Sequence, residues 1–149
     1  MRRCVSDLLR TGAVVVYTSP HSSVSDAIAK MARHNVGSIL VMENSHRLVG
    51  IFTERDLLQR VAARKLDMER TRLGDVMTAN VIVVSSETPR SEVLRIMDTH
   101  QIRHIPVTDG SHVVGVISLR DVLRFENAEK EFEIEQLRQY IHHPGPNAA

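Results

Sequence analysis

The chain carries one stretch of sequence twice. Residues 24–43 align with residues 90–109 at an offset of 66, and residues 46–58 align with residues 111–123 at an offset of 65. Ten of the 33 paired positions are identical, whereas unrelated sequences would share about two. Two copies are too few for a solenoid, so the duplication predicts two similar units that pack as a pseudo-twofold pair.

The composition limits the class of protein to which this pair can belong. A chain of 149 residues fits one compact domain or two half-size units, and 42% hydrophobic residues exclude global disorder. The formal net charge of +1 offers no strong field for nucleic acid or an anionic membrane. The single cysteine, Cys4, excludes a disulfide framework and a cysteine-based zinc cluster. With no apolar run of membrane length and no leader pattern, we expect a soluble cytoplasmic protein.

Each copy shows the same order of patterns, β-α-β-β-α. The first strands are the valine-rich stretches 13–17 and 81–84, and each is followed by a helix with apolar residues on one face. Ser23-x-x-Asp26 has the spacing of a capping box. Thr88-Pro89 predicts an N-cap followed by proline at the first helical position.

Two further strands and a second helix complete each copy. The strand pairs are 38–42 with 48–52 and 104–108 with 113–117, and the second helices open at Thr53 and Ser118. A last helix runs from about Leu119 towards His142. The predicted fold is therefore α+β, of the α/β type. We expect these segments: a first repeat over 7–64, a connector over 65–74, a second repeat over 75–125, a C-terminal helix over 126–143 and a disordered tail over 144–149.

Each copy contains the motif Gly-x-x-Thr/Ser-x-x-Asp, at 50–56 and at 115–121. Thr53 and Ser118 stand three residues before the aspartate, which is the spacing of a capping box at a strand-to-helix turn. In such a box the hydroxyl accepts from the third helical N–H, and the carboxylate accepts from the N–H of the cap residue. Structure alone could explain both residues.

The arginine of each motif, Arg55 or Arg120, is harder to explain by capping. Each stands at the second helical position, where the helix dipole makes a cation unfavourable by a few tenths to about 1 kcal/mol. A bound anion would reverse this, because free N–H groups and the guanidinium would both face it. Alternatively, each arginine pairs with a nearby carboxylate such as Glu54 or Asp56. The sequence leaves both interpretations open.

The duplicated motif, the order of elements and Ile105-Pro106-Val107 after a helix resemble the cystathionine β-synthase (CBS) domain family. Two such domains in tandem resemble a Bateman module. The resemblance covers Asp7 to about Phe125, including short lead-in helices that begin near Asp7 and Asp75. The second copy matches better, because Leu40 replaces the proline found at Pro106.

The resemblance implies a stand-alone regulatory module without a catalytic domain. Such a module needs no cofactor. It binds adenosine-containing ligands, such as AMP, ADP, ATP, NAD(H) or S-adenosylmethionine, in clefts between the repeats. It would form a homodimer and signal to a partner protein through a conformational change.

The resemblance also implies the residues of the two clefts. The aspartate of the motif would accept from ribose hydroxyls, the hydroxyl residue would contact phosphate, and the arginine would face phosphate. The first copy contributes Tyr17, Thr18, Val36, Ser38, Ile39, Thr53, Arg55 and Asp56. The second contributes Val83, Ile102, Arg103, His104, Ile105, Pro106, Ser118, Arg120 and Asp121. Because aromatic residues are only 3% of the chain, adenine is expected between aliphatic walls, with Ile102, Ile105 and Val83 favoured. His104 could contact the base or fill a core position.

Three other functions compete with this one. A structural homodimerisation module with degenerate pockets would have the same sequence pattern. RNA binding is disfavoured by the near-neutral charge and the scarcity of stacking aromatic residues. An enzyme would need a catalytic constellation, and neither a nucleophile elbow nor an ordered triad pattern is found. Most of the eight histidines are interpreted as solvated side chains rather than as a zinc site.

Overall fold

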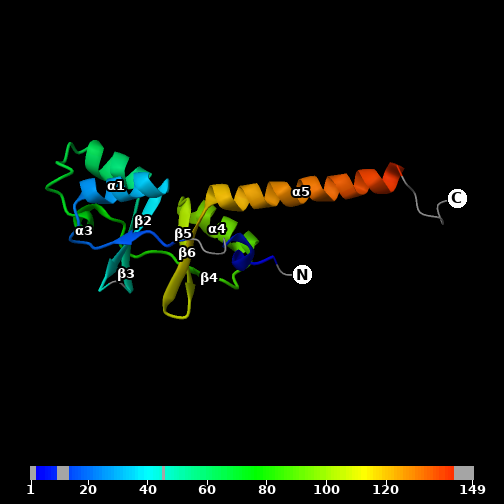
Figure 1. The fold of residues 1–149 in the computed structure, drawn as a ribbon, viewed down its shortest axis with the longest axis horizontal. Helices are drawn as coiled ribbons and strands as arrows, with labels where there is room; N and C mark the ends of the chain where they lie inside the picture. Colours follow the sequence, from blue (N-terminus) through cyan, green and yellow to red (C-terminus); the bar gives the residue numbers. More distant parts are fainter. Residues whose placement is uncertain (1–2, 10–13, 45, 143–149) are drawn as a thin grey trace.

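Two three-stranded sheets, one from each repeat, form the body of the protein (Figure 1). The computed structural model describes residues 3–9, 14–44 and 46–142. The strands are β1 (Tyr17–Thr18), β2 (Ser38–Glu43) and β3 (Arg47–Thr53) in the first sheet, and β4 (Val84–Ser85), β5 (His104–Asp109) and β6 (His112–Ser118) in the second. In each sheet the first strand runs parallel to the second, and the second runs antiparallel to the third. The predicted α+β fold with two matching repeats is confirmed.

Seven helical segments accompany the sheets in the described part of the chain. They are η1 (a 3-10 helix, Val5–Leu8), α1 (Val24–His34), α2 (Glu54–Asp56), η2 (a π-helix, Leu57–Ala62), α3 (Leu73–Val76), α4 (Arg90–His100) and α5 (Leu119–His142). The second helices open after Thr53 and Ser118, as predicted. In the described residues, no helix combines the length and the apolar character needed to cross a membrane.

The first strand of each repeat is shorter than the sequence predicts. Strands are expected over 13–17 and 81–84, but only the two residues of β1 and the two of β4 join a sheet, and Ala13 lies outside the described residues. The valines before these strands are not part of either strand. Val15 and Val81 instead pack into an apolar cluster between the two sheets. Valine-rich sequence therefore indicates apolar packing here, and the position of the partner strand sets the length of the strand.

The start of α4 differs from its prediction by one residue. Pro89 is itself the N-cap and Arg90 is the first helical residue. The Thr88 hydroxyl does not cap the helix, because it accepts from the Ser85 N–H at 3.1 Å in the turn after β4. In α1, by contrast, the predicted cap is formed: the Ser23 hydroxyl accepts from the Asp26 N–H at 3.0 Å.

The short lead-in helices η1 and α3 are exchanged between the repeats. Val5 of η1 is buried in the core of the second repeat, beside Val84 and Val93. Leu73 and Val76 of α3 are buried in the core of the first repeat. Each apolar core therefore includes a helix from the other half of the duplication, and neither core is complete without it.

This exchange explains the glycine of each motif. A Cβ at Gly50 would overlap Sδ of Met77, and a Cβ at Gly115 would lie 2.8 Å from Cδ2 of Leu9. Both neighbours stand directly after a lead-in helix. The glycines thus let the exchanged segments pack closely on β3 and β6, independently of any ligand.

A third apolar cluster joins the two sheets. Leu40, Met42 and Ile51 of the first repeat are buried there, and Val113 and Val116 of the second pack against them. Strand β2 is accordingly buried on both faces over most of its length. This contact holds the repeats together as the expected pair.

Helix α5 begins in the second repeat and extends beyond the body as a single rod (Figure 1). Its first half is held by Arg90, whose side chain is 1% exposed, with Nη2 donating to both carboxylate oxygens of Glu129 at 3.1 Å. The Arg90 guanidinium also lies 4.4 Å from the centre of the Phe125 ring. Arg3 adds an ion pair to Glu129 at 2.9 Å. The predicted terminal helix is confirmed, and a buried cation anchors it.

Candidate functional site

Both copies of the motif form a capping box. The Thr53 N–H donates to Oδ2 of Asp56 at 3.0 Å, and the Asp56 N–H donates to the Thr53 hydroxyl at 3.3 Å. The corresponding distances are 3.0 Å and 3.1 Å between Ser118 and Asp121. The structural interpretation of the motif is therefore confirmed in both repeats. A ligand could bind only to those polar atoms of the motif that take no part in the capping hydrogen bonds.

The two motif aspartates differ in how many carboxylate oxygens remain available as acceptors after capping. Asp56 is 8% exposed, and the Thr78 hydroxyl donates to its Oδ1 at 3.1 Å, with Oδ2 at 3.3 Å. Nε of Arg60 lies 3.6 Å from the same Oδ1. Asp121 is half-buried, and in the described residues only its Oδ2 accepts, from the Ser118 N–H. The carboxylate of the first motif is saturated, whereas that of the second has a spare oxygen.

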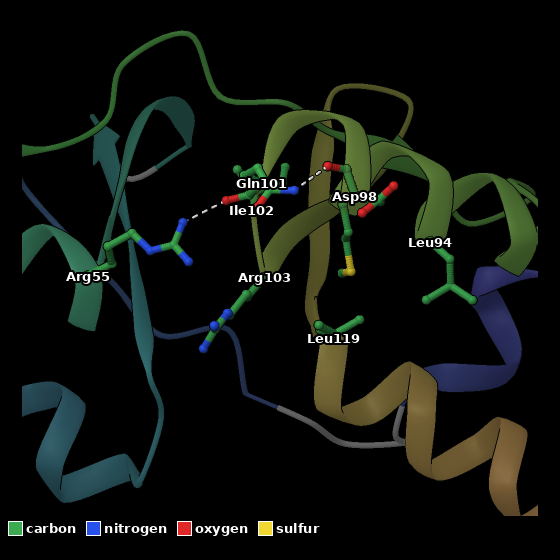
Figure 2. Close-up of a pocket in the computed structure, with 8 residues that line it drawn as sticks. Arg55, Leu94, Asp98, Gln101, Ile102, Arg103 and Leu119 are labelled. Carbon is green, nitrogen blue, oxygen red and sulfur yellow. Dashed lines mark hydrogen bonds between the residues drawn. The ribbon is translucent and has the colours of Figure 1, made fainter.

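The two motif arginines differ in the same way. Arg55 reaches across to the second repeat, where Nη1 donates to the backbone carbonyl of Gln101 at 2.7 Å (Figure 2). Gln101 ends α4 in the left-handed conformation, so a cation there is favoured by the dipole of that helix. The alternative that Arg55 pairs with Glu54 or Asp56 is wrong, because this carbonyl is its partner. Arg120 makes neither a hydrogen bond nor an ion pair within the described residues.

Arg55 borders the smaller of two cavities between the repeats. This cavity has a volume of about 340 Å³ and lies between the start of α2 and the end of α4 (Figure 2). Ile102 and Arg103 line it, together with Leu94, Met97, Asp98, Gln101 and Leu119. Of the two arginines that line this cavity, Arg55 is committed to the Gln101 carbonyl, whereas Arg103 lines the larger cavity as well.

The larger cavity is a cleft of about 1370 Å³ that opens at the motif of the second repeat. Of the residues expected at a ligand site, it brings together Val36, Ser38, Arg103, His104, Ser118, Arg120 and Asp121. It joins the start of α5 to the end of α1 and the start of β2, so both repeats contribute. Three arginines line this cleft, Arg103, Arg120 and Arg124, against two carboxylates, Glu54 and Asp121.

His104 is one of the residues that line this cleft. A Cβ built on Gly37 would be 3.3 Å from Nε2 of His104 and 3.3 Å from Cδ of Glu54, so these two side chains meet over Gly37. Burial lowers the pKa of His104 below its usual range, and the charges of Glu54 and Asp121 oppose this only in part. The imidazole is therefore neutral at neutral pH, and it lines the cleft while being half-buried.

The remaining expected site residues lie elsewhere. Ile39 and Ile105 are buried in the two repeat cores, and Pro106 is buried in β5. Thr18 hydrogen-bonds through its hydroxyl to that of Ser22 at 2.8 Å. Tyr17 carries the Lys30 ammonium 5.5 Å above its ring, and Val83 is exposed. Thr53 and Asp56 remain in their capping box.

Several residues that line the cleft are absent from the set expected from the sequence. They include Arg124 and Asn127 of α5, Glu54 of α2, Leu57 of η2, Met31 and His34 of α1, and Asn35 directly after α1. Arg124 could have been found, because it follows Arg120 by four residues and so shares its helix face. The residues of α1 have no such local signal, since only the packing of the repeats places them opposite the second motif.

Comparison with known proteins identifies relatives over most of the chain. The CBS domain family model matches residues 5–63 and 73–127. The chain is 33% identical over 130 residues to the mitochondrial CBS domain-containing protein CBSX3 of Arabidopsis thaliana, covering 85% of this chain and 63% of that protein. It is 32% identical over 120 residues to arabinose 5-phosphate isomerase KdsD of Yersinia pestis, covering 80% of this chain and 36% of the isomerase. The chain thus spans less than two thirds of either relative.

Solved structures share the fold over most of this chain. The CBS domain structure of NE2398 superposes with a TM-score of 0.78 at 32% identity, covering 85% of this chain and 98% of that one. The CBS domain protein PAE2072 of Pyrobaculum aerophilum, solved with AMP, has a TM-score of 0.72 at 26% identity, covering 79% and 88%. The CBS domain pair of MJ0100, solved with 5′-methylthioadenosine and S-adenosyl-L-methionine, has a TM-score of 0.76 at 25% identity, covering 87% and 99%.

Proposed function

Because the chain belongs to the CBS domain family, we propose that it is a regulatory module that binds a phosphorylated adenosine ligand between its repeats and performs no catalysis. The AMP bound by PAE2072 and the adenosine ligands bound by MJ0100 support the ligand class. The isomerase relative is matched over only 36% of its length, so no isomerase chemistry is carried over.

The observation that carries the proposal is the pair of uncommitted groups at the second motif. The spare Oδ1 of Asp121 is an acceptor for ribose hydroxyls, which a carboxylate binds well as a charged acceptor. One residue before it, the guanidinium of Arg120 has no partner in the described part of the chain. Both groups line the larger cleft, at the N-terminal end of a 24-residue helix.

The charge of the cleft favours a ligand with phosphate. Arg103 and Arg124 line the same space as Arg120, and the Arg103 carbonyl accepts from the first N–H of α5 at 2.8 Å, which places it beside the motif. With Asp121 directed to ribose, three cations and one carboxylate, Glu54, remain for the rest of the ligand. AMP, ADP, ATP and NAD(H) satisfy this balance better than the cationic S-adenosylmethionine does.

One cleft, rather than two, serves as the site in this proposal. The first motif has its carboxylate bound to Thr78 and its arginine bound to Gln101. A ligand there would have to displace both contacts before it could bind. The second motif meets a ligand without such losses, and its aliphatic neighbours Val16 and Val36 provide walls for the base in place of Ile105 and Val83.

The same cleft accounts for a regulatory effect. A nucleotide at Asp121 and Arg120 would also touch Val36 and Ser38 of the first repeat. It would therefore favour one arrangement of the repeats over others, and a partner protein that recognises that arrangement would respond to the nucleotide. The identity of the nucleotide can be read directly by mass spectrometry of material carried through purification.

Titration calorimetry with AMP, ADP and ATP tests the site. Arg120→Ala is expected to weaken binding by about tenfold to a hundredfold, because it removes a charged hydrogen bond to phosphate. Arg55→Ala, at the same position of the other motif, is the matched control and should change affinity much less. Equal affinity in the wild type and Arg120→Ala would contradict the assignment.

A structural module with degenerate pockets is the second candidate, and the saturated carboxylate of Asp56 is the observation that favours it. A ligand that binds only the folded state stabilises it by RT ln(1 + [L]/Kd) and so raises the melting temperature. If none of the three nucleotides stabilises the protein against heat, this structural role is the better explanation of the fold.

A further inference from the structure

The outer part of α5, residues 131–141, is here called the projecting segment. Every one of its side chains is exposed, and it extends beyond the body of the protein (Figure 1). The segment nevertheless carries large apolar residues: Phe132, Ile134, Leu137, Tyr140 and Ile141, with exposed fractions from 48% to 72%. An isolated helix as short as this segment is marginal in water, so a surface that covers its apolar side chains would stabilise this end of α5.

We propose that the projecting segment pairs with the same segment of a second copy of this chain, as a short parallel coiled coil. Ile134, Leu137 and Ile141 follow one another at spacings of three and four residues, which places them on one face as heptad positions a, d and a. Isoleucine at a with leucine at d is the combination that favours two parallel strands. The occupant is therefore a second helix with the same seam, which a second copy provides.

Charges beside the seam support pairing with an identical, parallel helix. In this register Glu133 occupies a g position and Arg138 the following e position, and residues at these positions pair between the two helices. Glu133 of each copy would pair with Arg138 of the other copy, so the dimer would contain two such ion pairs. Within the chain Glu133 accepts from Arg3 through Oε1 at 3.0 Å, and its Oε2 is left for a second cation.

The same register limits how far the pairing extends. One heptad earlier, the matching pair is Glu126 with Glu131, which carry like charges, and position d is Lys130. Glu126 is moreover directed to Arg90, 3.6 Å away, on the side of α5 that faces the body. The coil therefore begins after Lys130, beyond the contacts of Glu126 and Glu129 with Arg90.

The seam face of α5 is accessible along its length. Continued towards the body, it passes through Asn127 and Leu123, which line the larger cleft instead of packing into a core. The acidic residues Glu126, Glu129 and Glu133 that hold α5 to Arg90 and Arg3 lie beside this face and not on it. A partner helix can thus approach without breaking the contacts that anchor α5.

Sedimentation equilibrium on the full chain without nucleotide tests the proposal apart from ligand binding. The wild type should approach the mass of two chains as its concentration rises. Leu137→Asp should lose this association, whereas Gln139→Asp, with the same new charge on the outer face, should keep it. Far-UV circular dichroism of both variants reports whether the body has folded. A wild type of single-chain mass throughout, or a dimer that survives Leu137→Asp, would overturn the proposal.

A cysteine placed in the seam tests the parallel register. In a Cys4→Ser background, Leu137→Cys should form an inter-chain disulfide on mild oxidation, because a d position meets its own copy across the axis of a parallel pair. Gln139→Cys is the matched control and should crosslink far less. Equal crosslinking of the two variants, or more at position 139, would overturn the parallel seam.

Discussion

Replacing each motif aspartate by asparagine should separate the roles of the two repeats. Asp121→Asn keeps the shape of the side chain but removes the charge that the spare Oδ1 offers to ribose hydroxyls. A hydrogen bond to a charged group contributes about 1.5–3 kcal/mol. Nucleotide affinity should therefore fall by about tenfold to a hundredfold, while stability changes little because Asp121 is half-buried and its remaining oxygen can still accept from the cap N–H.

Asp56→Asn should have the opposite effect. Asp56 is 8% exposed and accepts from Thr53 and Thr78, so the amide places an N–H group against a hydroxyl or a backbone donor. Losing one charge-assisted bond in this buried network costs about 2 kcal/mol. For a chain of this size that corresponds to a fall of about 4–8 °C in Tm. The affinity of the folded fraction for nucleotide should remain near that of the wild type.

Calorimetric titration and differential scanning calorimetry on the same three proteins measure both quantities. The two substitutions are chemically identical and stand at equivalent positions, so each serves as the control for the other. If Asp56→Asn weakens nucleotide binding as strongly as Asp121→Asn, the first cleft is also a site and the argument from its saturated carboxylate is refuted. If Asp121→Asn binds as the wild type does, the ribose contact is refuted.

Two further outcomes follow from packing and burial. Gly50→Ala should destabilise the protein by about 1–3 kcal/mol, and by more than Gly115→Ala, because its Cβ would overlap Met77 Sδ and would also lie 3.1 Å from the backbone carbonyl of Thr78. Urea unfolding of both variants gives the comparison, and equal losses of stability would argue against backbone crowding at Gly50. Burial lowers the pKa of His104, so the folded state binds fewer protons than the unfolded state, and the free energy of unfolding should decline as pH falls from about 6.5 and level off below the folded pKa. His104→Gln should remove this part of the pH dependence, and an unchanged slope in that variant would contradict the assignment.

Sequence reasoning located the helices, the β2–β3 and β5–β6 strand pairs and both capping boxes, because these features depend on residues three or four positions apart. Thr53 with Asp56 and Ser118 with Asp121 are examples, since a cap requires only the right donor and acceptor at local spacing. The lengths of β1 and β4 could not be predicted in this way. Their valines have the correct propensity, but a strand ends where its partner ends.

The lining of the larger cleft was predicted in part for the same reason. The second motif and the residues before β5 belong to the cleft because the duplicated pattern marks them, and Val36 and Ser38 also line it. Ile105 and Ile39 carry the same pattern but face the cores. Alternation along a strand indicates which residues share a face, and only the packing of the second repeat decides which face is covered.

By itself, the sequence determined that this protein consists of two similar β-α-β-β-α units with a motif that caps a helix in each. The tertiary structure decided how the two copies differ. Thr78 reaches Asp56 across 22 residues and Arg55 reaches Gln101 across 46, which occupies the first motif and leaves the second available. Such contacts join residues that are far apart in the sequence, and no periodic pattern in the sequence indicates that they meet. Two similar motifs therefore acquire different chemistry when the repeats, with their exchanged lead-in helices, pack together.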